Sequence, residues 1–322
     1  MPNPAYEIIE PDVLILGSGG AGLCAALHLA AARPPPRVLL AVKGLFGKSG
    51  CTRMVQGGYN VVLRAPDSLE AHFRDTIEGG AWLNDQELAW LLVSEAPGRV
   101  LELENRVGCF FDRNPDGTVH QKPFAGQRFD RTVHKGDLTG IEIVNRLSEQ
   151  VAATATTVLE EVRAVELLHD HGRGRVVGAL LLDQRTGRFV VAQARATLLA
   201  TGGGPTMYKI AAPCHDKTCD GIAMAWRAGT TLMDMEMVQF HPTGLMAAGS
   251  QITGRCWRKA CAARARTYSI RRASATCCAT THAGSAPRGT SSPARATRRS
   301  WPGGAPRKAA CCWMSPIWAR SS

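Results

Sequence analysis

Residues 12–22 read DVLILGSGGAG, and they are the strongest indication of the fold class. Residues 13–16 are all apolar, which is typical of a short strand buried on both faces. Gly17, Gly19 and Gly22 then follow at the spacing of a dinucleotide-binding turn. In such a turn the first glycine permits the bend, the second lets the backbone approach a pyrophosphate, and the third lets helix and strand pack closely. The Ala- and Leu-rich segment to about Ala32 predicts a helix whose N-terminus faces the phosphates.

A second strand predicted at 38–42 completes a βαβ unit, because the three prolines at 34–36 end the helix. A routine nicotinamide site has Asp or Glu at the end of this strand, to hold a ribose. Here the strand ends in Val42 and Lys43. We therefore expect the ribose or phosphate to be held differently.

Two further glycine turns follow predicted strands. The first is KSGCT at 48–52 with QGG at 56–58, and the second is TGG at 201–203 after the apolar run 196–200. Any one of them could be an ordinary turn. Three such turns at the ends of parallel strands fit a large extended cofactor better than a mononucleotide.

The remaining patterns complete an α/β domain. Helical spacing predicts helices over 67–78, 84–105, 137–150 and 220–229, with Asp67 and Asn84 as N-caps. Alternating segments predict a β-meander over 158–165, 174–183 and 188–191. The fold class is therefore a Rossmann-like α/β domain with a β-meander insert.

His241 stands directly before Pro242. The proline restricts the preceding residue to an extended backbone, which fixes the direction of the imidazole. A positioned His could bind a carboxylate or transfer a proton. A hydrogen-bonded structural His is the alternative for this segment.

The net charge of +11 resides at the C-terminal end of the sequence. Residues 1–254 hold 24 Lys and Arg against 27 Asp and Glu, whereas residues 255–322 hold 12 Arg, 2 Lys and no acid. The composition excludes a disordered chain, a collagen and a disulfide miniprotein. No apolar run is long enough for a transmembrane segment. The cysteines lack metal-ligand spacing, so we expect no metal site and free thiols in a reducing cytoplasm.

Six ordered motifs together resemble one family. They are residues 17–22, 56–58, 124–127, 200–203, 220–225 and 239–244. The combination is similar to the flavoprotein subunit of succinate dehydrogenase and fumarate reductase, a family that includes L-aspartate oxidase. The resemblance covers about residues 9–254, and the family's chains are roughly twice as long as this one.

The resemblance implies FAD along the strand ends and hydride transfer between flavin N5 and a C4 dicarboxylate such as succinate or fumarate. An iron–sulfur subunit would accept or deliver the electrons, and no specific nucleic acid is expected as a partner. By matching position, the residues around the dicarboxylate would be Phe124, Gly126, His241 and Thr253. Those contacting FAD would be Gly17, Gly19, Gly20, Gly22, Lys43, Ser49, Gln56, Gly57, Gly58, Thr201, Gly202 and Asp220.

One departure from the family concerns the attachment of FAD. Respiratory members attach it through a His just before Gln-Gly-Gly, but no His lies between His28 and His72. We therefore expect noncovalent FAD. L-Aspartate oxidase remains an alternative, although Phe124-Ala125-Gly126 and Gly244 differ from its usual residues.

The second departure is the segment 255–322, which contains no Leu, Val, Phe, Asp or Glu but six Cys and four Trp. Shifting the reading frame of G/C-rich codons turns Arg255–Arg266 into LLEEGVRGEGA and Arg288–Arg295 into RDVVSRA, which are strings that the family places there. We therefore interpret this segment as out-of-frame translation and expect it to be disordered. The alternative is a basic arm that binds polyanions on a noncatalytic fragment.

The predicted organisation is an FAD-binding domain over 1–233, the start of a capping domain over 234–254, and the non-family tail over 255–322. The sequence lacks the family's proton-donating Arg, so none of its residues is assigned a catalytic role. We expect a truncated chain with weak or no FAD retention and no turnover. The expected location is the cytoplasm, with attachment to a membrane only through a partner.

Overall fold

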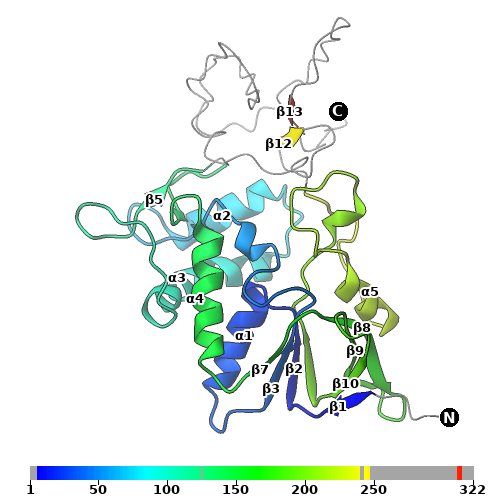
Figure 1. Ribbon diagram of the computed structural model, residues 1–322. Coiled ribbons are helices and arrows are strands. Elements are labelled where there is room, and N and C mark those ends of the chain that lie inside the picture. Colours follow the sequence, from blue (N-terminus) through cyan, green and yellow to red (C-terminus); the bar gives the residue numbers. More distant parts are fainter. Residues whose placement is uncertain (1–5, 125, 240–242, 247–309, 314–322) are drawn as a thin grey trace, which may run out of the picture.

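The computed structural model describes residues 6–124, 126–239, 243–246 and 310–313. Its centre is a parallel sheet in which the predicted βαβ unit supplies two neighbouring strands (Figure 1). The strand order is β11 (Ala196–Leu199), β2 (Val13–Leu16), β3 (Val38–Ala41) and β7 (Thr157–Leu159).

The two faces of this sheet are buried against different layers. Successive side chains of a strand point to opposite faces, so Ile15 and Leu40 pack among helical residues on one face. Leu14 and Leu39 pack among residues of the meander on the other. Leu14, Ile15 and Leu40 are all completely buried, and each contributes roughly 1.5–3 kcal/mol of transfer free energy.

The helices that cover the first face begin and end close to their predicted positions. They are α1 (Gly20–Ala30), α3 (Gln86–Asn105) and α4 (Thr139–Ala152), with α2 (Leu69–Gly79) packed against α3 and α5 (Asp220–Arg227) against β8. Both predicted N-caps were wrong. Ser68 caps α2 by accepting a hydrogen bond from the Ala71 N–H, and Asp85 caps α3 by accepting one from the Leu88 N–H.

The meander forms a second sheet, in the order β1 (Glu7–Ile9), β10 (Phe189–Gln193), β9 (Arg175–Asp183) and β8 (Val162–Asp170). The prediction of one strand over 158–165 was wrong, because the chain divides there. Residues 157–159 extend the parallel sheet, Glu161 adopts a positive φ of 55°, and β8 then enters the meander. The segment 158–165 contains no Gly, Pro, Asn or Asp, so the sequence pattern did not reveal the turn.

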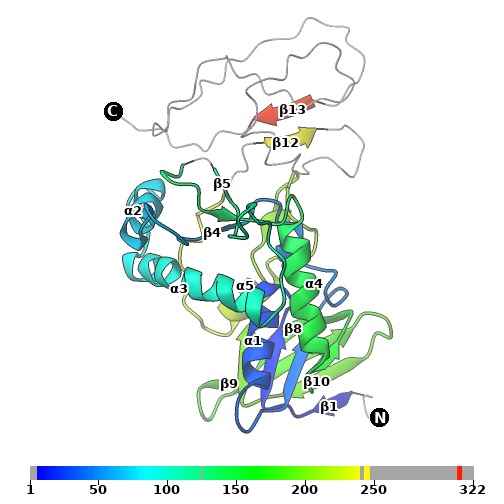
Figure 2. The same ribbon diagram turned by 90° about the vertical axis from the view of Figure 1, so that its left-hand side faces the viewer.

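A small third sheet lies at the end of the molecule far from the N-terminus (Figure 2). It contains β4 (Tyr59–Asn60), β6 (Thr132–Val133) and β5 (Gln121–Lys122). Two 3-10 turns, η1 (Thr52–Met54) and η2 (Pro205–Met207), complete the described structure around the parallel sheet.

Within the predicted tail, the structure describes only β13 (Ala310–Trp313), which pairs antiparallel with β12 (Thr243–Met246). The expectation of disorder was wrong for these four residues. The other residues of 255–322 lie outside the described residues.

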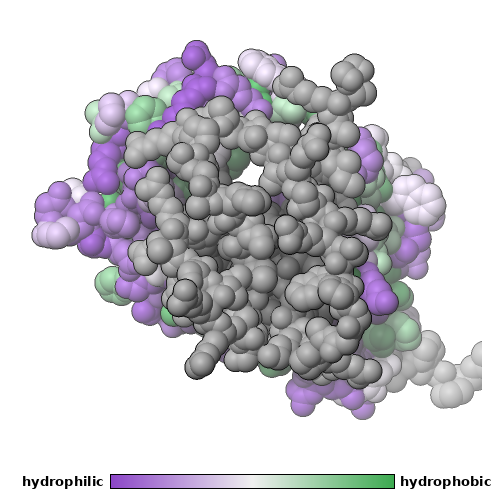
Figure 3. Space-filling model, turned by 90° about the horizontal axis from the view of Figure 1, so that it is seen from above, coloured by the Kyte–Doolittle hydropathy of each residue, from purple (hydrophilic) through white to green (hydrophobic). Residues whose placement is uncertain are grey.

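The surface of the described residues is mixed in character. Hydrophilic and hydrophobic side chains alternate around the rim of the upper face (Figure 3). Trp82 and Leu83, just before α3, expose 66% and 64% of their surface, and Leu92 on α3 exposes 67%. None of the helices in the described ranges combines the length and apolar character needed to cross a membrane.

Candidate cofactor site

Three parallel strands end at one cavity of about 540 Å³. Gly17 follows β2, Lys43 closely follows β3, and Thr201 closely follows β11, and all three line the cavity. Open α/β sheets bind ligands in the crevice beyond the carboxyl ends of their strands. The volume is in the range of small-molecule and cofactor sites.

The glycines of the first turn have different roles. Gly17 has a φ of +111°, and a Cβ on it would lie 2.4 Å from the Ala200 carbonyl oxygen. A Cβ on Gly22 would lie 1.9 Å from the Gly17 carbonyl oxygen. A Cβ on Gly19 would meet only the Thr52 hydroxyl, at 3.5 Å. Gly17 and Gly22 therefore permit the turn to pack, whereas Gly19 leaves the backbone open toward the cavity.

The N-terminus of α1 faces the same cavity. Gly19 is its N-cap without any capping side chain, and the first turn carries no acidic residue. Gly20 lines the cavity, and its N–H donates to the Thr52 hydroxyl at 3.1 Å. Unpaired N–H groups and the helix dipole favour an anion at such an end, so a phosphate suits this position.

A charged cluster also lines the cavity. Lys43 Nζ donates to Asp220 Oδ2 at 2.8 Å and to the Thr218 hydroxyl at 2.7 Å. Arg163 Nη2 from β8 donates to Asp220 Oδ1 at 2.9 Å. Burial raises the pKa of the Asp220 carboxyl, but the hydrogen bonds from Lys43 and Thr218 outweigh burial and the pKa is lowered. Asp220 is therefore ionised at neutral pH, and it holds two cations at the rim.

The structure brings eight of the twelve predicted cofactor residues together around this cavity. They are Gly17, Gly19, Gly20, Lys43, Ser49, Thr201, Gly202 and Asp220. Gly22 is buried behind the turn. Direct contact of these residues with FAD stays a prediction.

The predicted Gln56-Gly57-Gly58 segment does not line the cavity. A Cβ on Gly58 would lie 2.1 Å from the Val133 carbonyl oxygen, so this glycine permits the pairing of β4 with β6. The Gln56 side-chain oxygen is buried and has no hydrogen-bond partner within the described part of the chain. Such an acceptor is suited to a ligand with hydrogen-bond donors.

Of the four predicted dicarboxylate residues, the structure describes two, Phe124 and Gly126. Phe124 is half-buried and Gly126 is exposed, and both lie in the connection from β5 to β6. His241 and Thr253 lie outside the described residues. The substrate site therefore stays a prediction.

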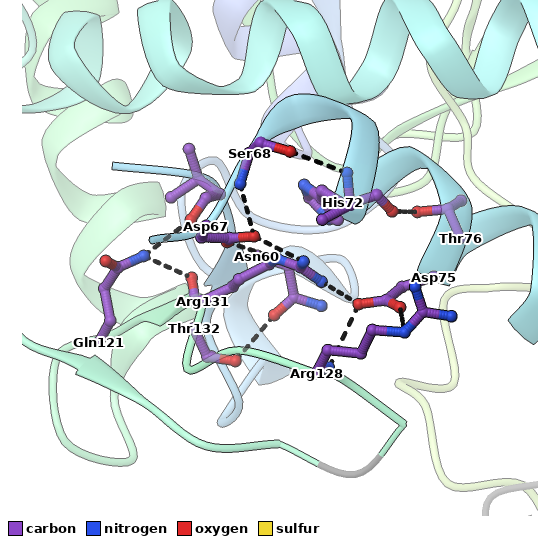
Figure 4. A network of polar contacts seen from close by, with 12 residues as sticks. Asn60, Asp67, Ser68, His72, Asp75, Thr76, Gln121, Arg128, Arg131 and Thr132 are labelled. Atoms are coloured by element: carbon purple, nitrogen blue, oxygen red, sulfur yellow. Dashed lines mark hydrogen bonds and ion pairs between the residues drawn. The ribbon is translucent and has the colours of Figure 1, made fainter. Parts of the chain in front are cut away.

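A buried arginine anchors the connection that carries Phe124 and Gly126 (Figure 4). Arg131 is completely buried, and its guanidinium donates twice to Asp67, at 2.6 and 2.7 Å, and once to Asp75 on α2. Gln121 on β5 donates to the Arg131 carbonyl oxygen at 3.2 Å. Paired carboxylates make burial of this charge tolerable, and the network fixes the small sheet to α2.

Sequence patterns did not single out several residues of these two sites. Arg163 and Thr218 reach the Lys43–Asp220 pair from β8 and from the segment before α5. Arg131 meets Asp67 and Asp75 across 64 and 56 residues of sequence. Isolated charged residues carry no local signal of such distant pairing.

The cavity fits an FAD molecule by its chemistry. A bare helix N-terminus and Lys43 suit the pyrophosphate. The open backbone at Gly19 leaves room for a ligand to approach closely. No histidine lies between His28 and His72, the stretch that contains Gln56-Gly57-Gly58, so noncovalent attachment of FAD stays a prediction.

Comparison with known proteins agrees with this geometry. The model of the FAD binding domain family matches residues 12–266, which extends past Gly254, where the family resemblance was expected to end. An uncharacterised FAD-dependent oxidoreductase of Methanocaldococcus jannaschii is 46% identical over 246 residues, which are 76% of this chain and 44% of that protein. One of the subunits of the CoM/CoB fumarate reductase of Methanothermobacter marburgensis is 42% identical over 243 residues, 74% of this chain and 44% of that protein.

A solved structure supports the same assignment. The FrdA chain of the E. coli quinol fumarate reductase superposes with a TM-score of 0.75 at 32% identity, covering 80% of this chain and 43% of that one. The chain thus spans less than half the length of these relatives. It belongs to the FAD binding domain family, it is similar over the matched region to the flavoprotein subunits of fumarate reductase and succinate dehydrogenase, and its cofactor is FAD.

Proposed function

We propose that this chain is the FAD-holding part of an oxidoreductase that interconverts a C4 dicarboxylate pair such as succinate and fumarate. The observation that carries the proposal is the cavity at the ends of β2, β3 and β11, in a chain 42% identical to one component of a fumarate reductase. Noncovalent attachment of FAD is part of the proposal.

Each group around the cavity has a role in this proposal. The backbone at Gly19 and Gly20 and the ammonium of Lys43 hold the pyrophosphate, and Asp220 holds Lys43 in place. FAD, when bound, supplies two-electron redox chemistry. Phe124, Gly126, His241 and Thr253 surround the dicarboxylate, with His241 and Thr253 donating hydrogen bonds to a carboxylate. Such donors orient a substrate and stabilise developing charge.

An iron–sulfur protein as electron partner and a cytoplasmic location are further parts of this proposal. The support for a partner is that the 42% identical relative is named as one subunit of a fumarate reductase. We also propose the division into an FAD-binding domain over 1–233, a capping segment over 234–254 and an out-of-frame tail over 255–322. Resequencing the DNA across the codons for 246–257 tests the frame. A missing or extra base there would make the true protein a full-length relative, and a frame that stands as given would make this chain a truncated one.

Titration of the purified full chain with FAD tests the cofactor site. We expect weak but saturable quenching of flavin fluorescence, and Gly19→Ala should weaken binding by about tenfold or more, because the new methyl blocks close approach of the pyrophosphate. Gly79→Ala is the matched control, since a Cβ there meets no atom within 4 Å and the position lies on α2. Equal affinities for wild type and Gly19→Ala would place FAD elsewhere.

Turnover is measured separately, with a reduced dye as electron donor and fumarate as acceptor. The sequence contains no Arg-Asp-Val-Val-x-Arg-Ala stretch, from which the resemblance draws the proton donor. We therefore expect at most weak FAD binding and no fumarate reduction. Turnover by FAD-loaded chain of this sequence would show that another residue supplies the proton.

A further inference from the structure

Two thiols meet at the edge of the FAD cavity. Cys51 and Cys214 are 163 residues apart in the sequence, and their Sγ atoms lie 3.3 Å apart. Both are free and half-buried, and Cys51 lines the cavity directly after Gly50. The cavity opens to solvent, so a small molecule has access to Cys51. The proposed dicarboxylate chemistry uses neither thiol.

The surroundings of Cys51 favour a thiolate. The hydrogen bond with Cys214 lowers the pKa of Cys51 to about 6, with a further contribution from the positive charge of Lys217. The same hydrogen bond, together with burial, raises the pKa of Cys214. The two thiols therefore share one proton, which Cys214 keeps while Cys51 carries the charge. The thiolate is the reactive form of cysteine.

The segments that carry the two cysteines are already in contact. The N–H of Gly50 donates to Asp216 Oδ2 at 3.4 Å. Within the second segment, the Lys217 N–H donates to the Cys214 carbonyl oxygen at 3.4 Å. Lys217 also lies over the third glycine turn, because a Cβ on Gly202 would be 3.0 Å from its Cε. The charged groups that influence the thiol pair are thus Lys217 and Asp216.

We propose that Cys51 and Cys214 form a thiol–disulfide exchange site for low-molecular-mass disulfides. The Cys51 thiolate attacks one sulfur of the disulfide, forms a mixed disulfide and expels the other half as a thiolate. Cys214 gives up its proton and attacks Cys51 Sγ, which expels the second half. The protein pair loses two electrons and becomes a disulfide, and the small disulfide is reduced to two thiols.

The other described cysteines differ from this pair. Burial raises the pKa of the Cys24 thiol, and it raises that of Cys109 to about 12. Cys219 donates to the Gly204 carbonyl oxygen, at 3.7 Å. The product of the proposed exchange is a bond between two segments that both border the cavity, 48–52 and 214–218.

Peptide mapping of the full chain after incubation with glutathione disulfide tests the proposal. We expect a cross-linked peptide joining Cys51 to Cys214 as the main disulfide among the described cysteines, reversed by dithiothreitol. Cys214→Ser should stop the reaction at a mixed disulfide of glutathione on Cys51. Cys24→Ser is the matched control and should leave the Cys51–Cys214 link unchanged.

Alkylation of the unaltered chain provides a measurement that needs no variant. At neutral pH, iodoacetamide should modify Cys51 about tenfold faster than Cys24, because only the Cys51 thiolate is populated. Equal alkylation rates, or a link from Cys51 to Cys214 no more abundant than links to Cys24 or Cys219, would overturn the proposal. FAD binding is not part of either readout, so failure here leaves the cofactor site untouched.

Discussion

The cavity at the parallel strands and the small sheet beside α2 are held in place by different means. Around the cavity, backbone atoms approach one another so closely that Gly17 and Gly22 have no room for a Cβ. In the small sheet, the charge of Arg131 is buried between Asp67 and Asp75 (Figure 4). The cavity requires residues without a side chain at these two positions. The small sheet requires a buried charge whose ion-pair partners are in place.

This difference determines how each region should respond to substitution. A close backbone approach is disturbed by adding a single methyl group at one residue. A buried ion pair is disturbed most by removing one partner, because the remaining charges stay in a poorly solvated place. The Arg131 network joins α2 to the strand that follows the Phe124 connection, so its loss should also release that connection.

The largest effect is expected for Arg131→Met. This substitution leaves Asp67 and Asp75, each only 7% exposed at the side chain, without their central cation. Breaking a buried pair from one side costs about 3–5 kcal/mol of unfolding free energy. Urea unfolding of the full chain, followed by circular dichroism, measures this loss.

Arg128→Met is the matched control for that measurement. Arg128 also pairs with Asp75, at 3.0 Å, but 44% of its side chain is exposed. Exposed pairs contribute about 1 kcal/mol or less, so the loss should be several-fold smaller. Similar losses for the two variants would show that burial of Arg131 is not what makes its network important.

A smaller effect is expected for Gly17→Ala at the cavity. The substitution places a Cβ 2.4 Å from the Ala200 carbonyl oxygen, at a φ of +111°. Strain of the backbone and displacement of β11 together should lower the free energy of unfolding by about 3 kcal/mol, and they should also weaken FAD binding. Urea unfolding with and without FAD measures both consequences.

Gly174→Ala separates the two causes. Gly174 also has a positive φ, of +62°, but a Cβ there meets no atom within 4 Å. Gly174→Ala should lower the free energy of unfolding only through the unfavourable left-handed backbone conformation of alanine, by about 1 kcal/mol. If Gly17→Ala costs no more than Gly174→Ala, close contact with Ala200 is not what requires the first glycine.

The two regions also differ in how well the sequence predicted them. The strands at 13–16, 38–41 and 196–199 and the turn at Gly17 follow from local patterns, because apolar runs and glycine spacing determine them within a few residues. The convergence of Lys43 with Asp220 was expected only from the family resemblance. It results from strand order, which brings residues 177 apart in sequence to one sheet edge.

The small sheet had no local signal of comparable strength. Its strands are two residues long, too short for any alternation to appear. Asp67 was predicted as an N-cap, since carboxylates are common at helix N-termini. Its carboxylate instead accepts hydrogen bonds from Arg131, and Ser68 caps the helix. The predicted strand over 158–165 failed for a related reason, because no Gly, Pro, Asn or Asp marks the turn between β7 and β8 and only their partners distinguish the two strands.

The smallest effect concerns Asp220 and depends on pH. Hydrogen bonds from Lys43 and Thr218 hold the pKa of its carboxyl below the ordinary value of 3.8 despite burial. A carboxyl with a lowered folded-state pKa contributes stability above its unfolded-state pKa and loses it as the pH falls through the folded-state value.

Asp220→Asn should therefore lower the free energy of unfolding by about 1 kcal/mol or less at neutral pH, since water screens this partly exposed cluster. The difference in unfolding free energy from wild type should shrink below pH 3.8. Urea midpoints across this pH range measure it, with the exposed Asp130→Asn as control. A difference that is independent of pH would mean that Asp220 acts by shape rather than by charge.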